Sequence, residues 1–465
     1  MQTRRNKQTD GMMLLPSLEE FIPQDHYLRR LDRVLDLSFV HEAVTDKYCQ
    51  DNGRPSIDPE VIIRLFLLQA IENIPSVRRL MSRVHVDLAY RWFIGYRVDE
   101  KVPDHSTLSK ALDRLGDEVF NRLFARSIAA CQRSGLIEGK VLHVDATTIR
   151  ADLDANRVNK EDSPDKDARF GRFPDGKTRP GYKQQTIADD KTRVVVGLSV
   201  TAANSPDDND LAELVDESVA HLGTPPDAVC ADGGYSSGFN CHAMASRNIR
   251  LVSPPHPVPL TRGHGSYTVE DFEYREDVDE FVCPAGEHLT FRGLDATRPG
   301  RRIYMVSGKP CRSCSLQSQC TRTTRRRLRV GPHHASLIRL RADSKTESFK
   351  QIYRRRAPVI EGVFAEAKQW HGLGRAWRRG LSKMRRVPQV FRLGGGPVAH
   401  PLLRPRRRKG EGKGWVPALS IDLYHRIKHL HFLTLKTITN LNLPQWFQSV
   451  PQLRRQFIPI KRFLQ

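Results

Sequence analysis

The sequence predicts an α/β protein in which a mixed β-sheet core with flanking helices follows an all-helical domain and carries a small cysteine-rich insertion. Helical start signals and apolar residues at helical spacing occupy residues 16–135. From residue 136 to residue 254 the predicted elements follow the order βββ-α-β-α-β, and cysteines then cluster in a segment rich in Pro, Gly and charge. The order βββ-α-β-α-β is that of a ribonuclease-H-like core.

The composition indicates a globular protein with a polyanionic partner. The chain has 465 residues, 39% of them hydrophobic, with 75 Lys and Arg against 53 Asp and Glu and a net charge of +22. Such a surplus of positive charge favours DNA as the partner. The longest apolar run, Val61–Leu68, is too short to span a membrane, and no apolar segment follows the basic N-terminus. We therefore expect no membrane partner and a cytoplasmic, nucleoid-associated protein.

The first domain, residues 16–135, is predicted to be helical and to bind DNA. Asp58 is a predicted N-cap with a proline after it, and a second helix start precedes Leu108 and its apolar repeats. Between them, basic residues alternate with Trp92 and Phe93. This pattern fits either DNA contact or a solvated face beside core aromatics.

The first part of the core, residues 136–254, is predicted to begin with a three-stranded antiparallel meander. A helix, a strand, a Gly-Gly turn, a second helix and a last strand follow. The predicted strands are Val141–Ile149, Lys183–Ala188, Arg193–Val200, 228–232 and Ile249–Ser253, and the first predicted helix is Asp207–Leu222. The segment 152–182 is polar and rich in Pro and Gly, so it is predicted to be an exposed loop.

Residues 255–345 are predicted to be an insertion that a metal ion stabilises. Its cysteines are Cys283, Cys311, Cys314 and Cys320. Four thiolates satisfy a tetrahedral structural Zn²⁺, and a reducing compartment favours metal ligation over disulfides. The spacing is irregular, however, so four reduced surface thiols are the alternative.

The chain beyond the insertion divides into a core helix with a basic segment, 346–395, and an atypical basic and amphipathic tail, 396–465. Residues 346–410 hold 17 Lys and Arg against 3 Glu, a net charge of +14. We expect this segment, with Arg375, Arg378 and Arg379, to contact DNA phosphates.

Three carboxylates are the candidate catalytic and metal-binding residues. Asp145 lies in the middle of a β-branched strand and Asp232 ends another, positions that are costly for a carboxylate without a cation. Glu361 lies on a predicted helix that begins near Pro358, and Lys368 follows two turns later on the same face. Together they could hold two Mg²⁺ or Mn²⁺ ions for phosphodiester chemistry, with Lys368 on a phosphate. Taken alone, Glu361 and Lys368 also fit an exposed charge pair.

Several stretches resemble the DDE transposases of bacterial insertion sequences, in particular the InsH-like group with a helical N-terminal domain. The matching stretches are Gly53–Pro59, Tyr90–Gly95, Val102–Thr107, His143–Thr147, Ala231–Tyr235 and Val359–Lys368, in the family's order. The resemblance implies that Asp145, Asp232 and Glu361 are the metal-binding triad, that the cysteine insertion separates the last two, and that the activity is cleavage and strand transfer of an insertion sequence.

The resemblance also concerns the residues around Glu361. The family's signature has a tyrosine and an arginine before the glutamate and a lysine after it, which correspond here to Tyr353, Arg356 and Lys368, all expected to contact DNA. Arg356 lies one residue further from Glu361 than in the family, and the family's helix after Arg386 is replaced by Gly- and Pro-containing sequence. The expected partners are double-stranded transposon ends and target DNA, bound by a homo-oligomer. A metal-dependent nuclease and a catalytically silent DNA-binding protein derived from a transposase are the alternatives.

Overall fold

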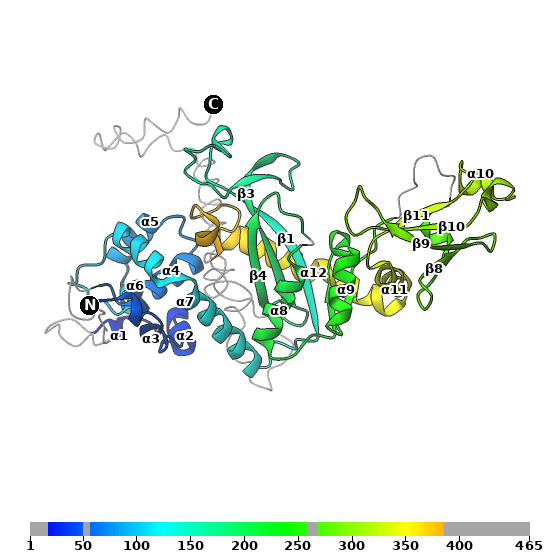
Figure 1. Cartoon of the computed structure of the whole chain (residues 1–465). Coiled ribbons are helices and arrows are strands. Elements are labelled where there is room, and N and C mark those ends of the chain that lie inside the picture. Colours follow the sequence, from blue (N-terminus) through cyan, green and yellow to red (C-terminus); the bar gives the residue numbers. More distant parts are fainter. Residues whose placement is uncertain (1–16, 50–55, 208, 258–266, 386–465) are drawn as a thin grey trace, which may run out of the picture. The chain divides into compact units, whose positions relative to one another are not determined.

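The computed structural model describes residues 17–49, 56–207, 209–257 and 267–385 (Figure 1). Helices make up the first part of it, as predicted. In this described part of the chain, no helix is both long and apolar enough to cross a membrane. The N-terminal helices are α1 (Leu18–Phe21), α2 (Tyr27–Val34), α3 (Val40–Ala43), η1 (Thr45–Lys47), α4 (Pro59–Ile71), α5 (Val77–Val86), α6 (Leu88–Ile94) and α7 (His105–Arg133).

Local chemistry sets the starts and the burial of these helices. The Asp58 carboxylate accepts a hydrogen bond of 2.8 Å from the Glu60 amide, which caps α4 as predicted. Helix α4 is buried nearly all round, and Arg64 is tolerated there because its guanidinium pairs with Asp32 at 2.6 Å. In α6, Trp92 and Phe93 are buried. The structure thus assigns these two aromatics to the core, the second of the two alternatives.

The central sheet confirms the ribonuclease-H-like core. Strands β1, β3 and β4 are antiparallel, while β5 and β6 run parallel to β1, so the order across the sheet is β4-β3-β1-β5-β6, with β2 paired to the start of β3. The elements are β1 (Val141–Arg150), η2 (Ala155–Arg157), β2 (Arg169–Arg172), β3 (Thr178–Asp189), β4 (Val195–Ala202), α8 (Leu211–Leu222), β5 (Ala228–Cys230), η3 (Gly233–Tyr235), α9 (Gly238–Ser246) and β6 (Arg250–Val252).

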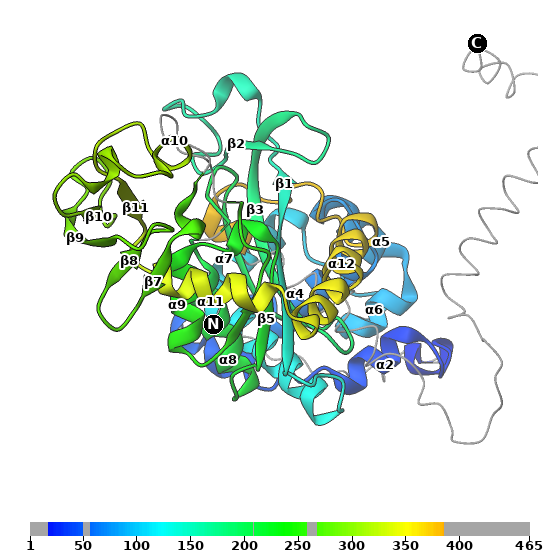
Figure 2. The same ribbon diagram turned by 90° about the vertical axis from the view of Figure 1, so that its right-hand side faces the viewer.

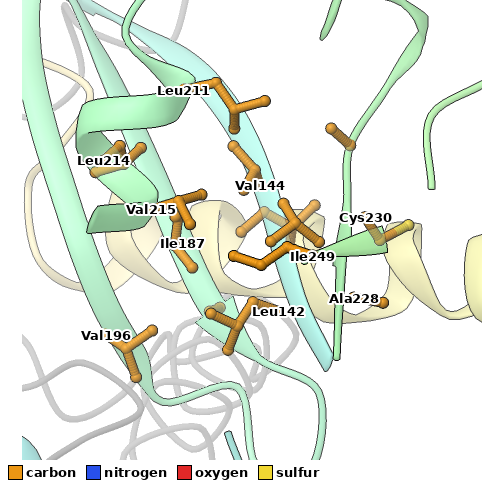
Figure 3. Close-up of a cluster of buried hydrophobic side chains, with 14 of the residues drawn as sticks. Leu142, Val144, Ile187, Val196, Leu211, Leu214, Val215, Ala228, Cys230 and Ile249 are labelled. Carbon is orange, nitrogen blue, oxygen red and sulfur yellow. The ribbon is translucent and has the colours of Figure 1, made fainter. Parts of the chain in front are cut away.

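The two faces of β1 have different surroundings. Leu142 and Val144 are fully buried and lie beside Leu214 and Val215 of α8 (Figure 3). Because side chains alternate along a strand, Asp145 points to the opposite face. That alternation, which the sequence predicts, leaves the carboxylate on the face away from α8.

Most residues of the segment 152–182 are exposed, as its composition predicts, but the segment is not a loop throughout. It contains η2, β2 and the first residues of β3, so the second predicted strand begins at Thr178, earlier than Lys183. Buried Asp165 holds it together, because the Tyr182 hydroxyl donates to its carboxylate at 2.6 Å. Polar composition misled the prediction since the segment's stability comes from this buried polar contact rather than from an apolar run.

The cysteine-containing insertion has a five-stranded antiparallel sheet of its own, in the order β11-β10-β9-β8-β7 (Figure 2). A separate small core, including Phe272, Phe281 and Tyr304, lies against it. Its elements are η4 (Val269–Asp271), β7 (Glu273–Arg275), β8 (Glu280–Val282), β9 (His288–Leu294), β10 (Arg302–Val306), η5 (Pro310–Arg312), α10 (Gln317–Cys320) and β11 (Arg327–Val330).

Helix α11 (His334–Ser344) begins with a buried histidine that should make stability depend on pH. Burial beside the rings of Tyr274 and Phe281, together with the smaller effect of the Arg341 charge, lowers the pKa of His334 to about 4. The pKa of an unfolded histidine is near 6.5. The contribution of neutral, buried His334 to the free energy of unfolding is therefore complete above about pH 6.5 and is lost as the pH falls toward 4.

The free energy of unfolding should decrease between pH 7 and pH 5 in the wild type. In His334→Phe we expect this decrease to be smaller by about 2 kcal/mol. Denaturant titrations at both pH values measure this decrease. The exposed His85 provides the matched control, His85→Phe. Equal pH dependence in the two variants would contradict the prediction.

The last described helix, α12 (Glu347–Trp370), corrects one expectation. Pro358 lies inside the helix, not in its first turn, because Thr346 caps the helix by accepting a hydrogen bond of 3.3 Å from the Phe349 amide. Burial of Phe349, Val359 and Ile360 outweighs the backbone hydrogen bond that proline cannot donate. The predicted tail, 396–465, lies outside the described residues.

Candidate active site

The two strand aspartates lie next to each other because β1 and β5 are parallel neighbours. Val141, Leu142 and His143 pair with Ala228, Val229 and Cys230. Continuing this register by two residues places Asp232 beside Asp145. Asp232 also caps η3, since its carboxylate accepts a hydrogen bond of 2.9 Å from the Gly234 amide. The sequence predicts this juxtaposition, and the structure brings these two residues together.

A guanidinium from α12 bridges the two carboxylates. Arg356 Nη2 lies 2.8 Å from Asp145 Oδ2 and 3.9 Å from Asp232 Oδ2. The Arg356 side chain is only 11% exposed, and its Nε has no hydrogen-bond partner in the described part of the chain. Arg356 was expected to contact DNA, but here its charge neutralises the aspartate pair.

The environment of Asp145 disfavours its charge. Burial raises the pKa of Asp145 to about 6, while Arg356 and a hydrogen bond of 2.8 Å from the Ala146 amide oppose that rise. Asp232 and Asp207 raise it further. A cluster of carboxylates around the largely buried Asp145 is most stable with a cation against it.

Asp207 is a member of this cluster that sequence reasoning missed. It follows β4 and forms an ion pair of 2.7 Å with Lys183 of β3. Its charge raises the pKa of Asp145 and the pKa of the Tyr235 hydroxyl. In both cases burial is the larger cause of the rise. The available signal was weak, because Asp207 stands in an Asp- and Asn-rich stretch that resembles an ordinary helix start.

Lys368 of α12 interacts electrostatically with this cluster. Burial lowers the pKa of Lys368 and the Asp145 charge opposes that change, so the two groups interact. Glu361 lies on the same helix, five residues after Arg356, and is exposed. It makes no hydrogen bond or ion pair with any residue that the structure describes. Its place as the third ligand therefore stays a prediction.

The other predicted DNA contacts have different surroundings. Tyr353 stacks against Phe349 at a ring distance of 6.3 Å and packs on the core. Arg375 and Arg379 both pair with Asp152, which follows β1. Arg378 is only 15% exposed and pairs with Asp113 of α7 at 2.6 Å. Arg378 thus joins the helical domain to the segment after α12, whereas Arg375 and Arg379 remain exposed.

The four cysteines of the insertion lie near one another. Burial raises the pKa of the Cys320 thiol, and Cys311, Cys283 and Cys314 add to the effect. Backbone amides of Glu287 and Arg326 donate to the sulfurs of Cys283 and Cys311, each at 3.3 Å. These contacts supply the N–H donors that favour thiolates.

Neither cluster is arranged as a finished metal site. Among residues 17–49, 56–207, 209–257 and 267–385, no three or more His, Cys, Asp or Glu side chains form a group that could hold an ion as they stand. An ion at either place therefore requires side chains to move. For the carboxylates, the residue that must move is Arg356, because it fills the space between Asp145 and Asp232.

Comparison with known families gives two matches. Residues 16–114 match the model described as a transposase domain (DUF772), and residues 282–394 match the model described as a transposase DDE domain. The second match includes Glu361 and all four cysteines, while Asp145 and Asp232 lie between the two matches. No curated protein matches the chain.

Solved structures show only distant likeness. The piggyBac transposase synaptic complex with hairpin DNA is similar with 10% identity and a TM-score of 0.33, over 84% of this chain and 86% of that one. The Mos1 transposase paired-end complex with the left transposon end has 11% identity and a TM-score of 0.16, over 45% of this chain and 62% of that one. At such TM-scores neither likeness supports a conclusion, and the fold assignment depends on the strand order alone.

Proposed function

We propose that this DDE-type transposase, identified by the two transposase domains it carries, cleaves DNA and joins the cut strand to a target at Asp145, Asp232 and Glu361. The observation that supports this site best is the pair of aspartates at the edge shared by β1 and β5, around one buried cation. We infer that Glu361 completes the set from α12, the helix that supplies Arg356.

The residues present fit divalent ions. Asp145 and Asp232 offer the carboxylate oxygens that Mg²⁺ and Mn²⁺ prefer, and Arg356 shows that the pair needs positive charge. Two such ions, when bound, would polarise the attacking oxygen and stabilise the leaving one. The chain's own part is to hold the carboxylates on a rigid sheet edge. Lys368, partly buried and within electrostatic reach of Asp145, would then hold a phosphate oxygen.

The proposed partner is double-stranded DNA, comprising transposon ends and target. The net charge of +22 provides the electrostatic attraction, and Arg375 and Arg379 lie exposed just after α12. Recognition of two ends would need more than one copy of the chain, so we propose a homo-oligomer on DNA, acting at the nucleoid.

We also propose one structural Zn²⁺ held by the four insertion cysteines, Cys283, Cys311, Cys314 and Cys320. Two observations support it. The other three cysteines raise the pKa of the Cys320 thiol, and backbone amides donate hydrogen bonds to the sulfurs of Cys283 and Cys311. The small core beneath the second sheet is a further reason, because small cores commonly need a metal or disulfide to persist.

The test is a reaction of purified protein with a DNA that carries the ends of its own element, with and without Mg²⁺ or Mn²⁺. We expect cleavage at the ends and joined products, both dependent on the divalent ion. Cleavage without joining would indicate the nuclease alternative. Binding without cleavage, under any divalent ion, would indicate the silent DNA-binding alternative and overturn the proposal.

A further inference from the structure

The end of β1 and the segment after α12 run side by side and bring two arginines together. The Arg150 amide donates to the Gly374 carbonyl at 3.2 Å, and the Ala376 amide donates to the Arg150 carbonyl at 2.7 Å. These bonds form a parallel bridge between Arg150 and Arg375. Residues paired in this way project to the same side of the ribbon, so the backbone fixes both arginines beside each other.

These two arginines line a pocket of about 340 Å³ together with Arg379, Asp152 and Asp154. One carboxylate occupies the centre of this arrangement. Arg375 Nη2 donates to Asp152 Oδ1, and Arg379 Nη2 lies 3.6 Å from Asp152 Oδ2. A single anion thus bridges two guanidinium groups, which is the geometry in which arginines also hold a phosphate.

The pocket keeps positive charge after its internal pairing. Arg150 makes no ion pair with any residue of the described ranges, although its charge acts on Asp152. Asp154 is partly engaged elsewhere, because its carboxylate accepts a hydrogen bond of 2.9 Å from the Asn156 amide at the start of η2. Three guanidinium groups therefore face two carboxylates, of which only Asp152 bridges two of them, and the net charge of +1 attracts a further anion.

We propose that this pocket, formed by Arg150, Arg375 and Arg379, binds a backbone phosphate of the DNA, and that Asp152 occupies the phosphate position in the DNA-free protein. The proposal rests on the DNA-joining function above. Arg150 follows Asp145 by five residues on the same strand, about 17 Å away in an extended chain. Because five is an odd number, the two side chains leave opposite faces of β1, so the phosphate held here lies away from the bond that is cut.

Two variants with opposite expected effects test the pocket by DNA binding at several salt concentrations. Asp152→Asn removes the internal competitor, so it should tighten binding about three- to tenfold at low salt and steepen the slope of log K against log salt by up to about 1. Arg150→Gln should weaken binding and flatten the slope by about 1. Fluorescence anisotropy with a labelled duplex measures both.

The chain offers a matched control for the aspartate. Asp216 is an exposed aspartate that receives two hydrogen bonds from Arg247, at 2.7 and 2.6 Å, outside the pocket. Asp216→Asn makes the same change in net charge as Asp152→Asn. Equal effects of these two variants, or an unchanged slope in Arg150→Gln, would overturn the inference.

Inorganic phosphate separates the two sources of the anion. In the wild-type protein, phosphate should displace DNA no better than sodium chloride of equal ionic strength, because the pocket takes a phosphodiester within a duplex. Displacement specific to phosphate that Arg150→Gln abolishes would assign the pocket to free phosphate and overturn the DNA assignment. Divalent-dependent cleavage by the wild type is measured separately, so failure of this inference leaves the proposed function intact.

Discussion

Replacing Asp145 by Asn should abolish divalent-dependent DNA cleavage while leaving duplex binding nearly unchanged. The substitution removes one ligand charge from the buried pair, and the Asn amide is a far weaker partner for a divalent ion. We expect a loss of at least about a hundredfold, since even residues that only support a metal ligand commonly contribute ten- to a hundredfold. DNA affinity should persist because the basic residues that provide it are elsewhere.

The helix carboxylates permit a sharper version of this experiment. Glu361 and Glu366 lie on the same helix, and Glu366 pairs with His371 at 3.8 Å. Glu361→Gln should lose cleavage as Asp145→Asn does, whereas Glu366→Gln should retain it. Full cleavage by Glu361→Gln would remove this residue from the proposed triad. A cooperative unfolding transition like that of the wild type, together with lost Mn²⁺ binding, distinguishes a lost ligand from a misfolded protein.

The aspartate pair was predictable because strand patterns carry positional information. A carboxylate inside a β-branched run is conspicuous, and parallel neighbouring strands put such residues at one edge. The alternation of Leu142, His143, Val144 and Asp145 even predicts which face each side chain takes: Leu142 and Val144 pack in one apolar cluster with α8, whereas the equally buried His143 pairs with Asp190. This part of the site depends on local periodicity alone.

The cation between the aspartates could not be predicted in the same way. Arg356 comes from a helix more than a hundred residues after Asp232, and its position depends on how α12 crosses the sheet. The three adjacent arginines Arg354, Arg355 and Arg356 have the same chemistry, and the family resemblance singles out Arg356 only as a DNA contact. Packing separates them: Arg355 pairs with Asp190 at 2.8 Å, and only Arg356 is directed at Asp145.

The pocket around Asp152 was equally hidden, for a different reason. Its segment, 152–182, reads as a loop because charge and proline dominate it. The pocket forms because the residue just before this segment pairs through its backbone with a distant one: the bridge from Arg150 to Arg375 is independent of side-chain type. Hydrogen bonds between distant main-chain segments leave no periodic signal in the sequence. The sequence therefore shows that these charged residues exist, but not that the fold brings them together.

Removing zinc should unfold the insertion while sparing the central sheet. If four thiolates hold one ion, the free energy of binding is also folding free energy for the small β7–β11 sheet, on the order of 10 kcal/mol for structural sites. Because four thiolates form one tetrahedral site, we expect about one equivalent of zinc in the purified protein. A chelator should then produce a low-temperature unfolding transition that added Zn²⁺ reverses.

Single cysteine variants decide whether the insertion thiols are responsible. Cys311→Ser should lose the zinc, because the Cys311 sulfur accepts a hydrogen bond from the Arg326 amide and lies near the other insertion thiols. Cys241→Ser should keep it, since Cys241 is buried in α9 outside the insertion. Less than about half an equivalent in folded wild-type protein would contradict a tetrahedral site. In that case the small core around Phe281 and Tyr304 must stabilise the second sheet without a metal.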